Sequence, residues 1–136
     1  MQGVAVASST KLAADAGAIV ADAGGNAVDA AVAAALVSIT TEPAICALGA
    51  GGFLTIWPPA GDPVTIDGYI EMPGRGLPPE RFGGGRRDVR IGYGGGVDLT
   101  VGHGSVGTPG GMAALSVASE RYGRLPWAEV VEPAYQ

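Results

Sequence analysis

The segment 27–39 constrains the fold of this 136-residue chain more than any other. It reads AVDAAVAAALVSI, in which only Asp29 and one serine are polar. Alanine and leucine favour the α-helix and Asn26 is a good N-cap, so the sequence predicts a helix here. It should end before Glu42-Pro43, because the residue before a proline avoids helical dihedrals. A helix that is apolar on all sides must be buried on most of them, which indicates a layered structure.

Two elements are expected ahead of this helix. The apolar run GVAVAS at 3–8 predicts a buried strand. Residues 11–23 have apolar side chains at helical spacing, with Ser9 or Thr10 as the N-cap. The glycines at 24–25 end that helix, since glycine adopts the left-handed conformation most easily.

A hairpin is expected after the apolar helix. Residues 53–57 (FLTIW) and 64–67 (VTID) are aromatic and β-branched, and PPAGD lies between them. The glycines at 49–52 should let the backbone pass close to the sheet; a direct role in substrate binding is the alternative. Helices combined with a hairpin predict an α+β fold, either a simple layered one or an αββα sandwich.

The second half of the chain is harder to interpret. Residues 82–96 are predicted to form a glycine-rich loop, followed by a strand at 97–101. A third helix is expected at 112–122, ended by Gly123 in the position after the helix. Pro126 opens a fourth helix, which runs to the end of the chain. A domain that stops inside a helix is usually a fragment, so we expect a part of a larger protein.

Composition supports that expectation and excludes other classes. Charged residues are 15% and apolar residues 47%, so the chain is not of the disordered type and has apolar surface that a partner segment would cover. The net charge is −5, and the one arginine cluster, at 86, 87 and 90, is interrupted by Asp88. No basic face for nucleic acid is therefore predicted.

The residue types that carry chemistry are scarce. The chain has one cysteine and one histidine, so no metal site is expected. We interpret Cys46 as a small buried residue rather than a nucleophile, and His103 as a loop residue rather than a general base. The segment GHGSVG at 102–107 fits the dinucleotide pattern, but Thr108-Pro109 separates it from the next helix. We therefore expect no nucleotide there.

Five short segments, taken in order, carry a specific resemblance. They are GGNAVDAAVAAAL at 24–36, Glu42-Pro43 leading to LGAGGF at 48–53, IDG at 66–68 with Pro73, VGTPG at 106–110, and YGRLPW at 122–127 with EPA at 132–134. Together they resemble the γ-glutamyltranspeptidase family over nearly all of residues 3–135, except 82–96. The resemblance identifies residues 1–136 as the N-terminal part of the large subunit of an N-terminal-nucleophile hydrolase.

The resemblance implies an αββα sandwich, of which this chain is a part, and a precursor that cuts itself into a large and a small subunit. It implies cleavage of γ-glutamyl amides such as glutathione, with the acyl group passed to water or an amino acid and no cofactor. In the family the N-terminal threonine of the small subunit is the nucleophile and its own amine the base. No threonine here lies in a similar motif. We therefore expect no catalytic residue in this chain, which should be inactive alone.

One position departs from the family pattern. DGYIEMP at 67–73 resembles a segment DGRExAP, whose arginine binds the substrate α-carboxylate, and Tyr69 stands in place of that arginine. A guanidinium holds a carboxylate with two charged hydrogen bonds, whereas a phenol has one and no charge. Either Arg75 substitutes for it, or the substrate has no free α-carboxylate, as for a related acylase or amidohydrolase. Asp67 is expected to be a turn or cap residue.

Alternatives and partners complete the expectations. A non-catalytic small-molecule-binding module would be a monomer that unfolds cooperatively, whereas a part of an enzyme would aggregate alone. The resemblance implies, as partners, the rest of the large subunit, the small subunit and a small amide substrate, with no nucleic acid and no membrane. The sequence starts with no signal peptide, so we expect the cytoplasm. A leader removed earlier would instead place the protein in the periplasm or outside the cell.

Overall fold

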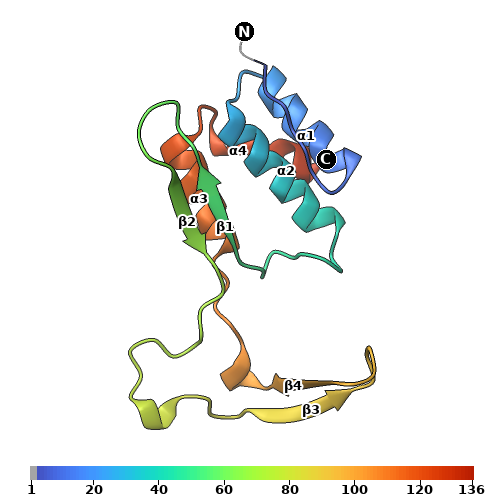
Figure 1. Cartoon of the computed structure of the whole chain (residues 1–136), viewed down its shortest axis with the longest axis vertical. Helices are drawn as coiled ribbons and strands as arrows, with labels where there is room; N and C mark the ends of the chain where they lie inside the picture. The colour runs from blue at the N-terminus through green and yellow to red at the C-terminus, as the bar shows by residue number, and fades with distance from the viewer. Residues whose placement is uncertain (1–2) are drawn as a thin grey trace.

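The computed structural model describes residues 3–136, which form a helical body and a projecting arm (Figure 1). The body contains α1 (Lys11–Asp22), α2 (Ala27–Thr41), α3 (Gly111–Tyr122), α4 (Trp127–Tyr135) and the antiparallel strands β1 (Gly52–Ile56) and β2 (Val64–Gly68). The arm contains a second antiparallel pair, β3 (Arg87–Ile91) and β4 (Val97–Val101), with the 3-10 turns η1 (Pro79–Arg81) and η2 (His103–Ser105). The predicted α+β class is confirmed.

The first two helices begin at the predicted caps. The Thr10 hydroxyl accepts a hydrogen bond from the backbone of Ala13 at 3.3 Å and starts α1. Asn26 accepts from the backbone of Asp29 at 3.1 Å, and Asp29 accepts in return from the backbone of Asn26 at 2.8 Å. This reciprocal capping box satisfies amides that have no partner inside the helix. The helix then continues to Thr41 and ends before Glu42-Pro43, as predicted.

Asp29 also fastens α2 to the turn between α3 and α4. Its carboxylate is fully buried and accepts backbone hydrogen bonds from Arg124, at 2.9 and 3.1 Å, and from Leu125, at 3.4 Å. The Asn26 amide donates to the Tyr122 carbonyl at 2.7 Å. We call these five residues the Asp29 lock. It joins the segments GGNAVDAA and YGRLPW, which are far apart in the sequence.

Gly123 ends α3, but not in the left-handed conformation that its predicted position implies. Its φ is −74°, which any residue can adopt. A Cβ at Gly123 would lie 2.5 Å from Asp29 Oδ1. A Cβ would also clash with the carbonyl oxygen of Ser119, so both the end of α3 and the Asp29 lock leave no room for a side chain at this position.

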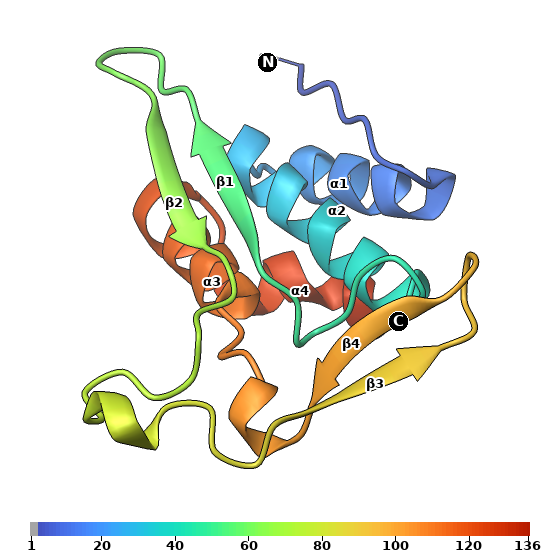
Figure 2. The same ribbon diagram turned by 60° about the horizontal axis from the view of Figure 1, so that its bottom comes forward.

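The core lies between the helices and one face of the β1–β2 pair. Its buried members include Val20, Val32, Leu36, Leu115 and Val130, and half-buried side chains of β1 and β2 pack against them. The opposite face of the pair is open (Figure 2). The body therefore has one helix layer and a two-stranded part of one sheet of a sandwich. Within residues 3–136, no helix combines the length and the apolar character needed to cross a bilayer.

Residues 3–8 are extended but form no strand, so that prediction is wrong. They run beside α2, where they and the alanines of that helix line a common cavity. A strand needs a neighbour that exchanges backbone hydrogen bonds. In the part of the chain that the structure describes, no strand lies alongside them.

The segment 82–96 is not a loop throughout, because β3 occupies its centre. Strand β3 pairs with β4 from Arg87 opposite Val101 to Ile91 opposite Val97. The short run RDVRI was hidden in the sequence by the glycines on both sides of it. The glycines at 94–96 make the turn between the strands, all with positive φ.

The arm, residues 72–107, is connected to the body by two chain segments, which we call its legs. One leg follows β2 and the other precedes α3. Glu71 and Thr108 join the legs through two backbone hydrogen bonds of 3.1 and 2.8 Å. We call this bridge the neck. It lies next to the end of β2 and the start of α3, so it places the residues that follow β2 at the junction of body and arm (Figure 1).

Candidate functional site

Tyr69 lies beside the neck, directly after β2, and two glycines hold its backbone. A Cβ on Gly51 would lie 2.8 Å from the carbonyl carbon of Tyr69 and 2.6 Å from the backbone nitrogen of Ile70. A Cβ on Gly110 would lie 2.8 Å from the Tyr69 carbonyl oxygen. We call Gly51, Tyr69 and Gly110 the glycine clamp. It confirms the predicted close backbone approach at Gly51 alone, because a Cβ on Gly49 or Gly52 would have no atom within 4 Å.

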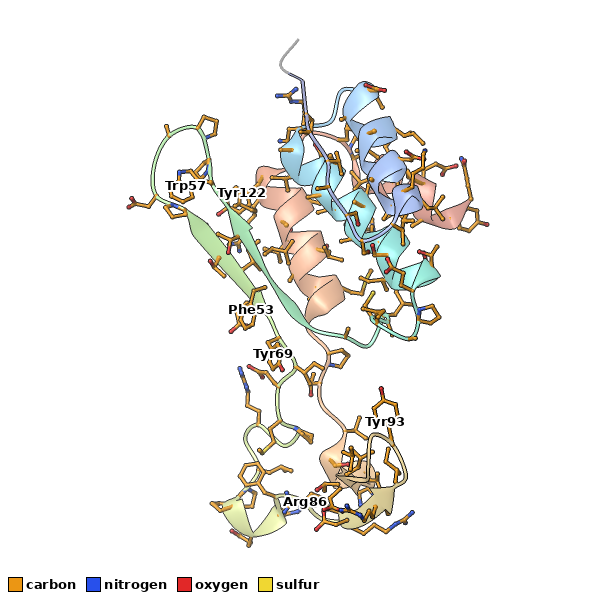
Figure 3. All side chains as sticks on the ribbon, turned by 45° about the vertical axis from the view of Figure 1, so that its right-hand side comes forward. Phe53, Trp57, Tyr69, Arg86, Tyr93 and Tyr122 are labelled. Carbon is orange, nitrogen blue, oxygen red and sulfur yellow. The ribbon has the colours of Figure 1, made fainter. Side chains whose placement is uncertain are left out.

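The Tyr69 side chain stacks on Phe53 of β1. The two ring centroids are 5.5 Å apart and the rings are almost parallel, at 9°. Both rings lie where the β1–β2 pair meets the arm (Figure 3). The Asp67 carboxylate accepts a hydrogen bond from the backbone of Tyr69 at 2.9 Å, which is the turn role predicted for it. Tyr69 remains 58% exposed and can therefore reach a ligand.

An open cavity of about 630 Å³ lies beside Tyr69. One wall contains Phe53, Asp67, Tyr69 and Glu71, and the other is formed by residues 108–110 and the first turns of α3. Its volume is typical of small-molecule sites. Among residues 3–136, those that line it include two carboxylates but no arginine or lysine. The cavity therefore suits an apolar or cationic group better than a carboxylate.

Arg75 does not line this cavity. Its guanidinium forms an ion pair with Glu71, four residues earlier on the leg of the arm. Both side chains are largely exposed, at 81% and 55%. The two predicted substrate-binding residues therefore both lie near the neck but have different surroundings. Tyr69 lines the cavity, whereas the Arg75 guanidinium is paired with the Glu71 carboxylate.

A second open cavity, of about 480 Å³, lies between α2, β1 and the loop before β1. Its lining is almost entirely apolar and includes Cys46, Met112 and Leu115. Cys46 is half-buried, and its thiol donates to the carbonyl of Ser38 at 3.4 Å. Cys46 is therefore less buried than predicted.

His103 lies on η2 in the arm and is exposed, as expected for a loop histidine. Within residues 3–136, no hydrogen bond joins it to Cys46 or to a carboxylate that could orient it. The same residues contain no group of three or more His, Cys, Asp or Glu side chains placed to hold a metal ion. The described part of the chain therefore shows an open cavity beside Tyr69 and no pair of nucleophile and base.

Sequence reasoning missed Phe53 as a partner of Tyr69. The register of the hairpin pairs Phe53 with Asp67, which makes Tyr69 the diagonal neighbour of Phe53 on the same face. That register was not available from the sequence. The only signal was the alternation in β1, which places Phe53 on the face opposite Leu54.

Comparisons with known proteins agree on one family. The family model described as Gamma-glutamyltranspeptidase matches residues 13–136. The glutathione hydrolase proenzyme of Pseudomonas aeruginosa is 34% identical over 98% of this chain and 23% of its own length. The acylase ACY 1 proenzyme of Pseudomonas sp. (strain SE83) is 36% identical over 90% of this chain and 22% of its own length.

A solved structure supports the same conclusion for the fold. The γ-glutamyltranspeptidase of Pseudomonas nitroreducens, complexed with L-DON, superposes on 98% of this chain with a TM-score of 0.73 and 30% identity. The match covers 38% of that chain. The chain thus spans about a fifth of the length of the relatives it matches in sequence. Its sequence and fold together show that it belongs to the γ-glutamyltranspeptidase family.

Proposed function

We propose that this chain is the front part of the large subunit of an enzyme that cleaves γ-glutamyl amides. The acyl group would pass to water or to an amino acid. The observation that carries this proposal is the family match, which runs through both walls of the Tyr69 cavity. The nucleophile would be a threonine at the N-terminus of a small subunit, outside these 136 residues, with its own amine as base. That relatives are named as proenzymes supports such a division into subunits.

The role of this chain would then be to bind the acyl donor. Phe53 and Tyr69 offer an aromatic surface to the aliphatic part of the donor. Asp67 lines the same cavity and would attract the α-ammonium group of a γ-glutamyl donor, whereas the neighbouring Glu71 carboxylate is already paired with Arg75. The Tyr69 hydroxyl can donate one hydrogen bond to a donor oxygen.

A second candidate is an acylase whose donor has no free α-carboxylate. The absence of arginine and lysine from the residues lining the cavity favours it, because nothing there neutralises a carboxylate. The pairing of Arg75 with Glu71 favours it too, since a ligand would have to compete for that guanidinium. The resemblance to acylase ACY 1 is in line with this candidate.

Three p-nitroanilide donors, assayed with the full-length protein, separate the two candidates. The γ-glutamyl compound carries both the amine and the carboxylate, the glutaryl compound only the carboxylate, and the 4-aminobutyryl compound only the amine. The first candidate predicts the highest kcat/KM for γ-glutamyl. The acylase candidate predicts that the 4-aminobutyryl donor is cleaved at least as well. Release of p-nitroaniline from none of them by the processed protein would contradict both.

A further inference from the structure

The β3–β4 hairpin of the arm has one polar and one apolar face. Alternate residues of a strand point to opposite faces, and the register places cross-strand partners on the same face. One face carries Asp88, Arg90, Asp98 and Thr100. The other carries five aliphatic side chains and one arginine: Arg87, Val89, Ile91, Val97, Leu99 and Val101. We call this second set the apolar arm face.

The polar face is complete by itself. Arg90 donates to both carboxylate oxygens of Asp98, at 2.9 and 3.0 Å, and Thr100 donates to Asp88 at 2.6 Å. Cross-strand pairs of this kind suit a solvent-exposed surface. Nothing on this face requires another partner.

The apolar arm face is not covered within residues 3–136. The hairpin contacts η2, whereas α1–α4 pack elsewhere (Figure 1). Ile91, Val97 and Leu99 remain 41%, 38% and 40% exposed. A two-stranded hairpin alone is marginally stable in water, and aliphatic side chains gathered on one of its faces mark an interaction surface.

We propose that the apolar arm face docks on an apolar surface from the part of the same polypeptide that lies outside these 136 residues. This inference rests on the proposed function only in requiring that the chain is part of a longer protein. The solved relative supports this occupant, because its matched region includes 98% of this chain, and more than half of that relative lies outside the match. An internal partner needs no association in solution, so it would cover the arm at any protein concentration.

Arg87 adds a requirement for the occupant. It lies at one end of the apolar arm face and makes no ion pair within residues 3–136. Burial of an unpaired guanidinium is unfavourable. The docked surface should therefore be apolar opposite Leu99 and carry a carboxylate or backbone carbonyls opposite Arg87.

Cysteine labelling of the full-length protein tests the proposal. Leu99→Cys places a thiol on the apolar arm face, and the matched control Thr100→Cys places one on the polar face of the same strand. Both thiols fall in the tryptic peptide 91–121, so their maleimide labelling can be measured separately from other cysteines. We expect labelling at position 99 to be at least about tenfold slower than at position 100, because access to a docked thiol requires local opening. In denaturant the two rates should be equal.

Three outcomes would overturn the proposal. Equal labelling rates in the native protein would mean that the apolar arm face is open. Protection that disappears on dilution to a monomer would mean that a second copy covers it. Fast amide exchange throughout 87–101 in the unmodified full-length protein would mean that nothing docks there, whatever the variants show. Each can occur while the anilide assays succeed, so a failure here is distinguishable from failure of the proposed function.

Discussion

The body and the arm are both held by hydrogen bonds, but in opposite environments. In the body, the Asp29 carboxylate is fully buried, and its partners lie at the N-cap of α2 and in the distant turn between α3 and α4. In the arm, the Arg90–Asp98 pair is 62% and 71% exposed and joins neighbouring strands only. Buried polar groups that lose a partner are costly, whereas exposed ion pairs contribute little. Removing a polar contact should therefore destabilise the body more than the arm.

The difference also explains where the family segments lie. GGNAVDAA and YGRLPW meet in the Asp29 lock, and LGAGGF and VGTPG meet in the glycine clamp. The stretch that matches none of the segments, 82–96, lies in the arm. The segments thus describe a scaffold that fixes the backbone of Tyr69 and the helix layer behind it.

The largest effect is expected from Asp29→Ala. It leaves the backbone N–H groups of Asn26, Arg124 and Leu125 without an acceptor. We expect the free energy of unfolding to fall by about 3 kcal/mol or more, at roughly 1–3 kcal/mol for each unsatisfied group. Urea unfolding of the full-length protein, followed by circular dichroism, measures the change.

Asp15→Ala is the matched control for that variant. Asp15 pairs with Lys11 on the exposed side of α1. Its removal should change stability by at most about 0.5 kcal/mol. If Asp29→Ala unfolded at the same urea concentration as this control, the Asp29 lock would not be what fastens the helices together.

An intermediate effect is expected from Gly51→Ala. The new Cβ would meet the backbone of residues 68–70, which cannot move aside like a flexible side chain. Overpacking of this kind costs about 1–3 kcal/mol. Displacement of Tyr69 should also lower kcat/KM for the preferred donor by about tenfold or more. Gly49→Ala, where a Cβ has no atom within 4 Å, should leave both values near the wild type. Equal behaviour of the two variants would contradict the glycine clamp.

The smallest effect is expected from Arg90→Ala in the arm. Its exposed pair with Asp98 should contribute no more than about 1 kcal/mol. Because Arg90 lies on the polar face, donor kinetics and the labelling of position 99 should stay unchanged. A loss of stability comparable to that of Asp29→Ala would show that the arm, like the body, depends on its own polar contacts.

The sequence was sufficient for elements that are fixed by local signals. Thr10 and Asn26 predicted where the first two helices start, and the aromatic and β-branched runs predicted the β1–β2 hairpin; the structure confirms both. It failed where the cause is distant. Residues 3–8 looked like a strand, but a strand depends on a partner that the described chain does not provide. Asp29 was noted only as a polar residue in an apolar helix, because its partners at the α3–α4 turn lie 95 residues further on.

The candidate site shows the same division. The resemblance to the family singled out Tyr69 as a substrate-binding position. The glycines at 49–52 predicted that the backbone passes close to the sheet. Neither could show the stacking on Phe53 or the cavity with two carboxylates and no cation in its lining, because both depend on strand register and on the fold of the neck. The assignment of Tyr69 and Arg75 to substrate binding stays a prediction.

The most direct test of the central claim, that Tyr69 lies at the donor site, is Tyr69→Arg in the full-length protein. A guanidinium there would supply the cation that the cavity lining lacks. We predict that kcat/KM for γ-glutamyl-p-nitroanilide, relative to the 4-aminobutyryl donor, rises by about tenfold or more, as expected for a charged hydrogen bond to the α-carboxylate. Tyr93→Arg, at an exposed tyrosine of the arm, is the control and should not change this ratio. An unchanged ratio in a correctly folded and processed Tyr69→Arg protein would contradict the claim.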